Sequence, residues 1–139
     1  MRPGLRDPNC LQVRTGGPAQ QNLLRYPLSM TIATASKIEA LRDDFGSGAA
    51  VADLLGVSRS RVTRWLKGEG IDPLNAERVD LLELVWSNLI RIYDNDAARE
   101  WLLGLNPNLG DRRPIDLIRA GRAEELMRAI RAERADSFA

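Results

Sequence analysis

Basic and hydroxyl side chains are concentrated between residues 58 and 67, at a spacing that suits contact with DNA. If this segment is helical, its outer face contains no carboxylate and consists of Arg59, Ser60, Arg61, Thr63, Arg64 and Lys67. Such a face complements the phosphate-lined major groove, where an arginine can also bind a guanine edge through two hydrogen bonds. We predict that Arg59, Ser60 and Arg64 contact base edges, that Ser58, Thr63 and Lys67 contact phosphates, and that Arg61 does either.

The residues just before this face have the pattern of a helix-turn-helix. Two short helices that cross tightly need a small residue midway along the first and a glycine at the turn, and Ala52 and Gly56 meet these needs. The positions that would hold the two helices together are all apolar: Val51, Leu55, Val57, Val62 and Trp65. The alternative, a cationic solvated helix in an ordinary bundle, does not account for these features together.

One helix-turn-helix makes too few contacts for tight specific binding, so we expect a homodimer that places two such units in successive grooves. The candidate interface is a long helix predicted from about residue 75 to 93. Its apolar stripe is widened by Leu81, Leu84 and Ile90. The alternative is that all of this apolar surface belongs to the core of a single chain.

Catalysis is disfavoured by the residue types that the chain lacks. It has no histidine and a single cysteine, Cys10, so the usual general base and a cysteine-based metal site are both missing. No GxxxxGK[ST] phosphate loop is present, since the glycine-containing loop 104–110 lacks the lysine. We therefore predict a protein that is not an enzyme and has no cofactor. Without a long apolar run or a signal peptide, we also predict a cytoplasmic location and no membrane association.

Apolar spacing and helix-capping signals predict an all-α fold. A helix should begin at Ser36, which forms a capping box with Glu39, and should end near Gly46. Further helices are expected over 49–55, 58–67, 75–93, 97–103, 114–119 and 123–134, and no segment alternates with a period of two.

These helices suggest four regions: a flexible tail over 1–35, a DNA-binding helix-turn-helix domain over 36–70, a linking or dimerisation helix over 71–95, and a C-terminal helical domain over 96–139. Met30 is a plausible translation start, because regular patterning begins there. The alternative is a real N-terminal arm that touches DNA through Arg2, Arg6 and Arg14.

The C-terminal domain carries the most specific pattern. Trp101-Leu102 is followed by Asn106-Pro107, then Leu109-Gly110, and then the run Arg113-Pro114-Ile115-Asp116-Leu117. Together with the basic helix-turn-helix and the Leu-rich helix, this order resembles antitoxins of the Xre/MbcA/ParS type. The resemblance covers about residues 36–139.

The resemblance implies a type II antitoxin that neutralises a cognate RES-domain toxin, which consumes NAD, and that binds promoter DNA to repress its own operon. It implies that the toxin, and not this chain, performs chemistry. The toxin-binding residues that it implies are Trp101, Asn106, Pro107, Leu109, Gly110, Arg112, Arg113, Pro114, Asp136, Ser137, Phe138 and Ala139.

Several of these residues have a second interpretation. Trp101 fits a core position, Arg112 and Arg113 would also suit a solvated loop, and Phe138 is either a partner anchor or a frayed end. The alternative for Asn106-Pro107 and Leu109-Gly110 is that they only shape a turn. The alternative for the whole protein is a free-standing helix-turn-helix regulator with a C-terminal dimerisation region.

Overall fold

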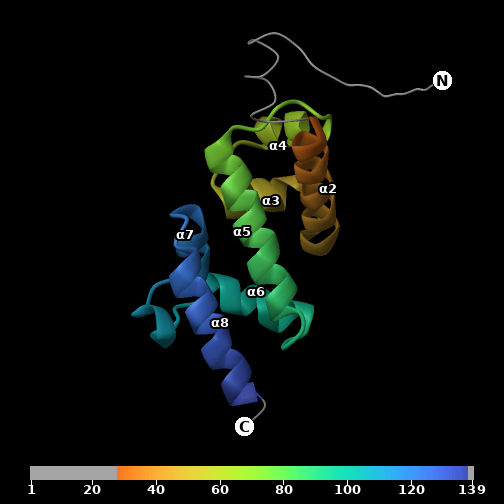
Figure 1. Ribbon diagram of the computed structural model, residues 1–139. Coiled ribbons are helices and arrows are strands. Elements are labelled where there is room, and N and C mark those ends of the chain that lie inside the picture. The colour runs from red at the N-terminus through yellow and green to blue at the C-terminus, as the bar shows by residue number, and fades with distance from the viewer. Residues whose placement is uncertain (1–27, 138–139) are drawn as a thin grey trace, which may run out of the picture.

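The computed structural model describes residues 28–137, with side chains from Thr34 onward. Its first half contains α2 (Leu28–Phe45), α3 (Gly48–Leu55), α4 (Arg59–Leu66) and α5 (Pro73–Leu89). Its second half contains α6 (Asn95–Leu103), the short 3-10 helix η1 (Pro107–Leu109), α7 (Pro114–Arg119) and α8 (Ala123–Ser137) (Figure 1). The described residues form no strand, only an isolated bridge between Asn106 and Arg112. The predicted all-α fold is confirmed.

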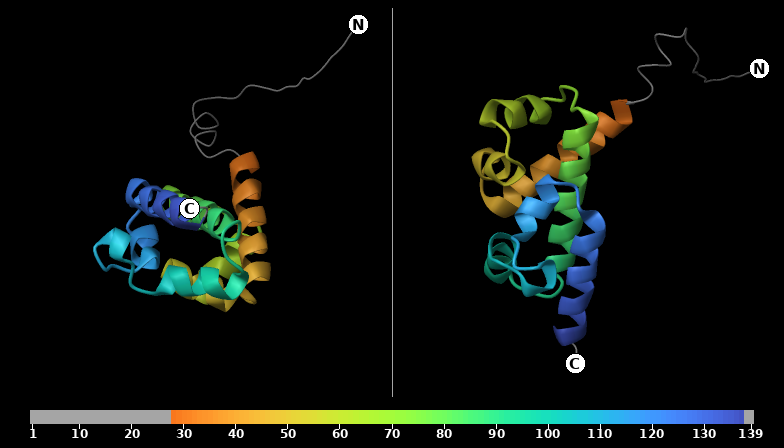
Figure 2. Two further views of the ribbon diagram at one scale, coloured as in Figure 1. Left: turned by 90° about the horizontal axis from the view of Figure 1, so that it is seen from below. Right: turned by 90° about the vertical axis from the view of Figure 1, so that its left-hand side faces the viewer.

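The long helix α5 joins two groups of helices. α2 packs against α3, α4 and α5, whereas α7 and α8 pack against each other and against α5 (Figure 1). α8 lies alongside α5, and α7 also reaches back to α3 (Figure 2). A continuous cluster of buried side chains runs through both groups, from Ile38 on α2 to Ile130 on α8. The two halves therefore share one core.

Helix α2 begins earlier than the sequence pattern suggested. It starts at Leu28, so Ser36 is an interior position and the predicted capping box at Ser36 and Glu39 is wrong. The physical reason is that no glycine or proline lies between Leu28 and Phe45 to stop a helix that can extend toward the N-terminus. Residues 1–27, which include most of the predicted tail, Cys10 and the arginines of the possible arm, lie outside the described residues.

The bounds of α5 also differ from the prediction of 75–93. Asp72 caps the helix by accepting a hydrogen bond from the backbone N–H of Asn75 at 3.2 Å, and Pro73 occupies the first turn. The helix ends at Leu89, whose carbonyl accepts bonds from the N–H groups of Ile92 and Tyr93, at 2.9 and 2.8 Å. Asp94 then caps α6. The chain must therefore turn before Tyr93.

The final helix is longer than predicted, since α8 continues to Ser137 instead of ending near Arg134. After the turn at Gly121 the sequence contains no further glycine or proline, so nothing local ends the helix sooner. No helix among the described residues has the length and apolar character needed to cross a bilayer.

Candidate functional site

Helices α3 and α4 form the predicted helix-turn-helix. Gly56 has a φ of 72°, in the left-handed region that glycine adopts readily, and its N–H closes the end of α3 on the carbonyl of Asp53 at 3.3 Å. Ala52, the small residue midway along α3, is buried. Ser58 begins α4, because its hydroxyl accepts a hydrogen bond from the N–H of Arg61 at 3.2 Å. Local signals therefore set both ends of the turn.

Burial of the apolar side of α4 determines which of its side chains face outward. Val62 and Trp65 are buried against the core, together with Val51 and Leu55 of α3, while Val57 is half-buried. Every predicted DNA-contacting side chain is exposed: Ser58, Arg59, Ser60, Arg61, Thr63, Arg64 and Lys67. The structure thus brings these side chains together on one accessible helix.

Two hydrogen bonds within the chain reduce what the hydroxyl groups of these residues can offer to DNA. The Thr63 hydroxyl donates to the carbonyl of Arg59 at 3.0 Å, and the Ser58 hydroxyl is occupied as a helix cap. Sequence reasoning also missed a nearby acid: Glu69, on the connector after α4, lies 3.9 Å from Nε of Arg64. Both side chains are more than half exposed, so this ion pair is weak enough for a phosphate to replace it.

The second candidate region, the loop between α6 and α7, is organised around Asn106. Its side chain is buried and accepts a hydrogen bond from the N–H of Asn108 at 2.8 Å. Its backbone carbonyl accepts from the N–H groups of Leu109 and Asp111, both at 2.9 Å. Gly110 closes η1 with a φ of 66°. Asn106 therefore shapes the loop from inside and presents no side-chain surface to a partner.

Leu109 and Pro114 are buried as well, so they also support the loop from within. Arg112 is tied to the fold: its Nε donates to the carbonyl of Leu109 at 2.7 Å, and its NH2 group donates to Glu125 on α8. The hydrogen bond from Arg112 and the nearby positive charges lower the pKa of Glu125. Arg112 thus fastens the loop to α8.

Only some of the predicted toxin-binding residues are exposed. Pro107 and Gly110 lie on the loop surface, Arg113 forms a two-bond ion pair with Asp116 at 3.0 and 3.1 Å, and Asp136 and Ser137 are exposed at the end of α8. Trp101 is half-buried against the core, and its indole Nε1 is buried without a partner among the described residues. Phe138 and Ala139 lie outside the described residues.

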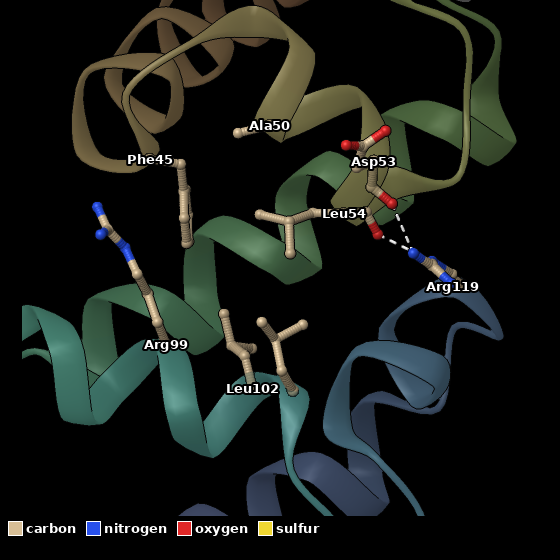
Figure 3. A pocket seen from close by; sticks show the side chains of 8 residues that line it. Phe45, Ala50, Asp53, Leu54, Arg99, Leu102 and Arg119 are labelled. Atoms are coloured by element: carbon tan, nitrogen blue, oxygen red, sulfur yellow. Dashed lines mark hydrogen bonds between the residues drawn. The ribbon is translucent and has the colours of Figure 1, made fainter.

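No sequence pattern predicted the contacts that join the two halves of the protein (Figure 3). A surface groove of about 350 Å³ lies between them, with apolar walls that include Phe45 and Leu54 from the first half and Leu102 from the second. Arg99 donates to the carbonyl of Asp44 at the end of α2, and its guanidinium lies 5.6 Å from the centre of the Phe45 ring. Arg119 reaches the end of α3 from the other side. No local signal marks these contacts, because each joins residues far apart in the sequence.

The fold and these surfaces define a class: an all-α protein in which an exposed basic helix-turn-helix shares one core with a smaller C-terminal helical region. No family model matches the sequence. The chain is similar to the mycobacterial cidal antitoxin MbcA of Mycobacterium bovis and of Mycobacterium tuberculosis, with 31% identity over 83 residues that cover 59% of this chain and 74% of each relative.

The structure is likewise similar to a solved one, the crystal structure of the M. tuberculosis MbcT–MbcA toxin-antitoxin complex. The TM-score is 0.60 at 29% sequence identity, and the match covers 71% of this chain and 91% of the chain in that complex. The chain belongs to the MbcA family of antitoxins, as the resemblance in its C-terminal region predicted.

Proposed function

We propose that this chain neutralises a cognate RES-domain toxin, which consumes NAD, through its C-terminal region and represses its own promoter through α4. The observation that carries the toxin part is the likeness to an antitoxin whose solved structure is a toxin-antitoxin complex. The RES class of the toxin follows from the resemblance of residues 101–118 to antitoxins of that type. The chain itself contributes binding surfaces and no chemistry.

The toxin-facing surface that we propose is narrower than the full predicted set. Asn106, Leu109 and Pro114 are buried, and they act by holding the loop in shape. The accessible contacts are Pro107, Gly110 and Arg113 on the loop and the end of α8 at Asp136 and Ser137. We also assign Phe138 and Ala139 to the toxin, since they continue directly from α8.

DNA binding is proposed on the exposed basic face of α4. Its cations lie on one helix whose other side is fixed by Val62 and Trp65, so the face is rigid and free of side chains from the core. The planar guanidinium of an arginine holds its N–H donors in a fixed geometry that matches the oxygens of a phosphate and the edge of a guanine. Two such faces would be needed for tight binding, so we propose a homodimer.

The dimer interface that we propose is the outer side of α5. Leu81, one of the candidates from the sequence, is only 7% exposed and belongs to the core, whereas Leu84 and Ile90 are each 44% exposed. Replacing Leu84 by Glu should convert a dimer to a monomer, as measured by sedimentation equilibrium. A Leu84→Glu variant that stays dimeric would place the interface elsewhere.

The proposed function is tested by co-expression with the product of the neighbouring reading frame, followed by a growth assay and co-purification. We expect the neighbour to be toxic alone, harmless with this chain, and recovered in a complex with it. If it is not toxic and forms no complex, the chain is a free-standing regulator whose C-terminal region has another role.

Two variants separate the two activities. Arg64→Ala should weaken promoter binding in a mobility-shift assay and leave neutralisation of the toxin intact. Removal of residues 136–139 should abolish neutralisation and leave promoter binding intact. Equal damage to both activities by both variants would contradict the division of labour.

A further inference from the structure

A polar cleft lies between α4 and the start of α5, beside the basic face of α4. Its volume is about 550 Å³, and three arginines line it: Arg61 and Arg64 from α4 and Arg78 from α5. Arg78 falls outside the helix-turn-helix pattern, so sequence reasoning did not connect it with α4. The fold alone brings these three guanidinium groups to one cleft.

Arg78 is held in place but has hydrogen-bond donors to spare. It is half-buried, and its NH1 group makes a long contact of 3.5 Å to the side-chain oxygen of Asn75. Its Nε is buried without a partner among the described residues. A guanidinium carries five N–H donors in a fixed plane, and a buried donor without a partner is unfavourable. An anion in the cleft would accept hydrogen bonds from the part of the Arg78 guanidinium that lines it, and its charge would offset that of the half-buried cation.

The carboxylates of the cleft do not meet this need. Asp72 is occupied with Asn75, whose side-chain and backbone N–H groups donate to its two oxygens at 2.7 and 3.2 Å. The side-chain hydrogen bond from Asn75 is the main reason that the pKa of Asp72 is lowered. Glu69 is paired loosely with Arg64. Among the described residues, neither Arg61 nor Arg78 has a carboxylate within ion-pair distance, and the charge of Arg61 is only the smallest of the causes that lower the pKa of Asp72.

We propose that this cleft binds a phosphate group of the DNA backbone, with Arg78 as a phosphate contact supplied from outside the helix-turn-helix. The inference rests on the proposed DNA binding by α4. DNA is favoured over free phosphate as the source, because Arg61 and Arg64 belong both to the cleft and to the exposed face that would lie against the duplex. A phosphate contact from α5 would also fix the angle at which α4 enters the groove.

The test is the salt dependence of binding to a labelled DNA duplex of random sequence, about 30 base pairs long to give each protein several helical turns. Each phosphate contact contributes about 0.9 to the slope of log affinity against log salt concentration. Arg78→Gln should therefore lower the slope by about 0.9. When salt is raised from 50 to 200 mM, the variant should lose roughly three- to four-fold less affinity than the unmodified protein. Arg78→Lys, which keeps the charge, should retain the slope.

The matched control is Arg91→Gln, because Arg91 is exposed just beyond the opposite end of α5 and its loss changes the net charge equally. Its slope should equal that of the unmodified protein. Circular dichroism of each variant checks the fold, so a lower slope in a folded Arg78→Gln protein reports the lost contact.

Each outcome separates this inference from the proposed function. If Arg78→Gln keeps the full slope while Arg64→Ala weakens binding, DNA binding stands and the role of Arg78 is refuted. If the unmodified protein does not bind DNA, both are refuted. The last experiment is a calorimetric titration with inorganic phosphate. If phosphate binds saturably, Arg78→Gln removes this binding, and the salt slope for DNA stays unchanged, the cleft binds a free anion and the inference is overturned.

Discussion

The Nε atom of Arg119, at the end of α7, donates a hydrogen bond to the backbone carbonyl of Leu54, near the end of α3, at 2.9 Å. The same guanidinium donates from NH2 to the carbonyl of Asp53 at 2.5 Å (Figure 3). These carbonyls lie in the last turn of α3, where helix geometry leaves carbonyl groups able to accept further hydrogen bonds and where a cation is favourable. The Asp53 carbonyl also accepts from the N–H of Gly56 at 3.3 Å. The C-terminal region thus stabilises the first helix of the helix-turn-helix directly.

Replacing Arg119 by Ala should lower the free energy of unfolding by about 1–3 kcal/mol, because it removes two charge-assisted hydrogen bonds, of which the one to the Leu54 carbonyl is part-buried. The value should lie toward the lower end, since the Arg119 side chain is 37% exposed. Urea unfolding measures the change. Arg131→Ala on the exposed side of α8 is the control and should stay within about 0.5 kcal/mol of the unmodified protein. Equal changes in the free energy of unfolding for the two variants would mean that the Arg119 contacts do not stabilise the packing of α7 against α3.

Gly56→Ala should destabilise the protein by about 1 kcal/mol or more, because an alanine is strained at a φ of 72°. The added Cβ would lie 3.4 Å from Nε of Arg119, an ordinary van der Waals contact, so the loss comes from the backbone strain. Gly70→Ala is the matched control, since its Cβ would meet nothing within 4 Å and its φ is not positive. Thermal unfolding should show a lower Tm for Gly56→Ala only. Identical shifts at the two positions would contradict the assigned turn.

Two tryptophans differ in whether the indole N–H has a partner. Trp86 donates to Asp44 at 3.0 Å, whereas Nε1 of Trp101 is buried with none among the described residues. Trp86→Phe should therefore lower the free energy of unfolding more than Trp101→Phe, by about 1–3 kcal/mol, because it leaves Asp44 without its donor. Denaturant unfolding of both variants gives the difference. A larger loss at Trp101 would show that its N–H does have a partner in solution.

Tyr93 should make stability depend on alkaline pH. Its hydroxyl donates to Glu133 on α8, and this hydrogen bond, with burial and the negative charge of Glu133, raises the pKa of Tyr93 to about 12. In the unfolded chain the pKa is about 10. The contribution to stability is therefore complete below pH 10 and is lost between about pH 10 and 12, as the unfolded state releases its proton first.

The measurement is the absorbance of tyrosinate during an alkaline titration, in a Tyr26→Phe background so that Tyr93 is the only tyrosine. Glu133→Gln should bring the pKa of Tyr93 down toward its usual value, since the carboxylate is the main cause of the shift. If the pKa of Tyr93 is near 10 in the protein that retains Glu133, the hydrogen bond between Tyr93 and Glu133 does not form.

The sequence was informative wherever a structural feature depends on residues within one or two helical turns. Ser58, Gly56 and Pro114 each act on the adjacent backbone, so the ends of α3, α4 and α7 were predictable. The prediction failed at Ser36 because a capping pattern inside a run without glycine or proline does not stop a longer helix. The predicted C-terminal end of α5 also differs from the structure, because that end depends on a turn and on the cap of the next helix.

The sequence by itself determined the all-α fold, the exposed basic face of α4 and the family, because helix periodicity, caps and local motifs are encoded in neighbouring residues. Only the tertiary structure decided which apolar residues of α5 remain exposed, that Asn106 supports its loop from inside, that Arg78 lines a cleft beside α4, and that Arg119 binds the last turn of α3. These features depend on how helices distant in the chain pack against one another. No local pattern of residue types specifies that packing.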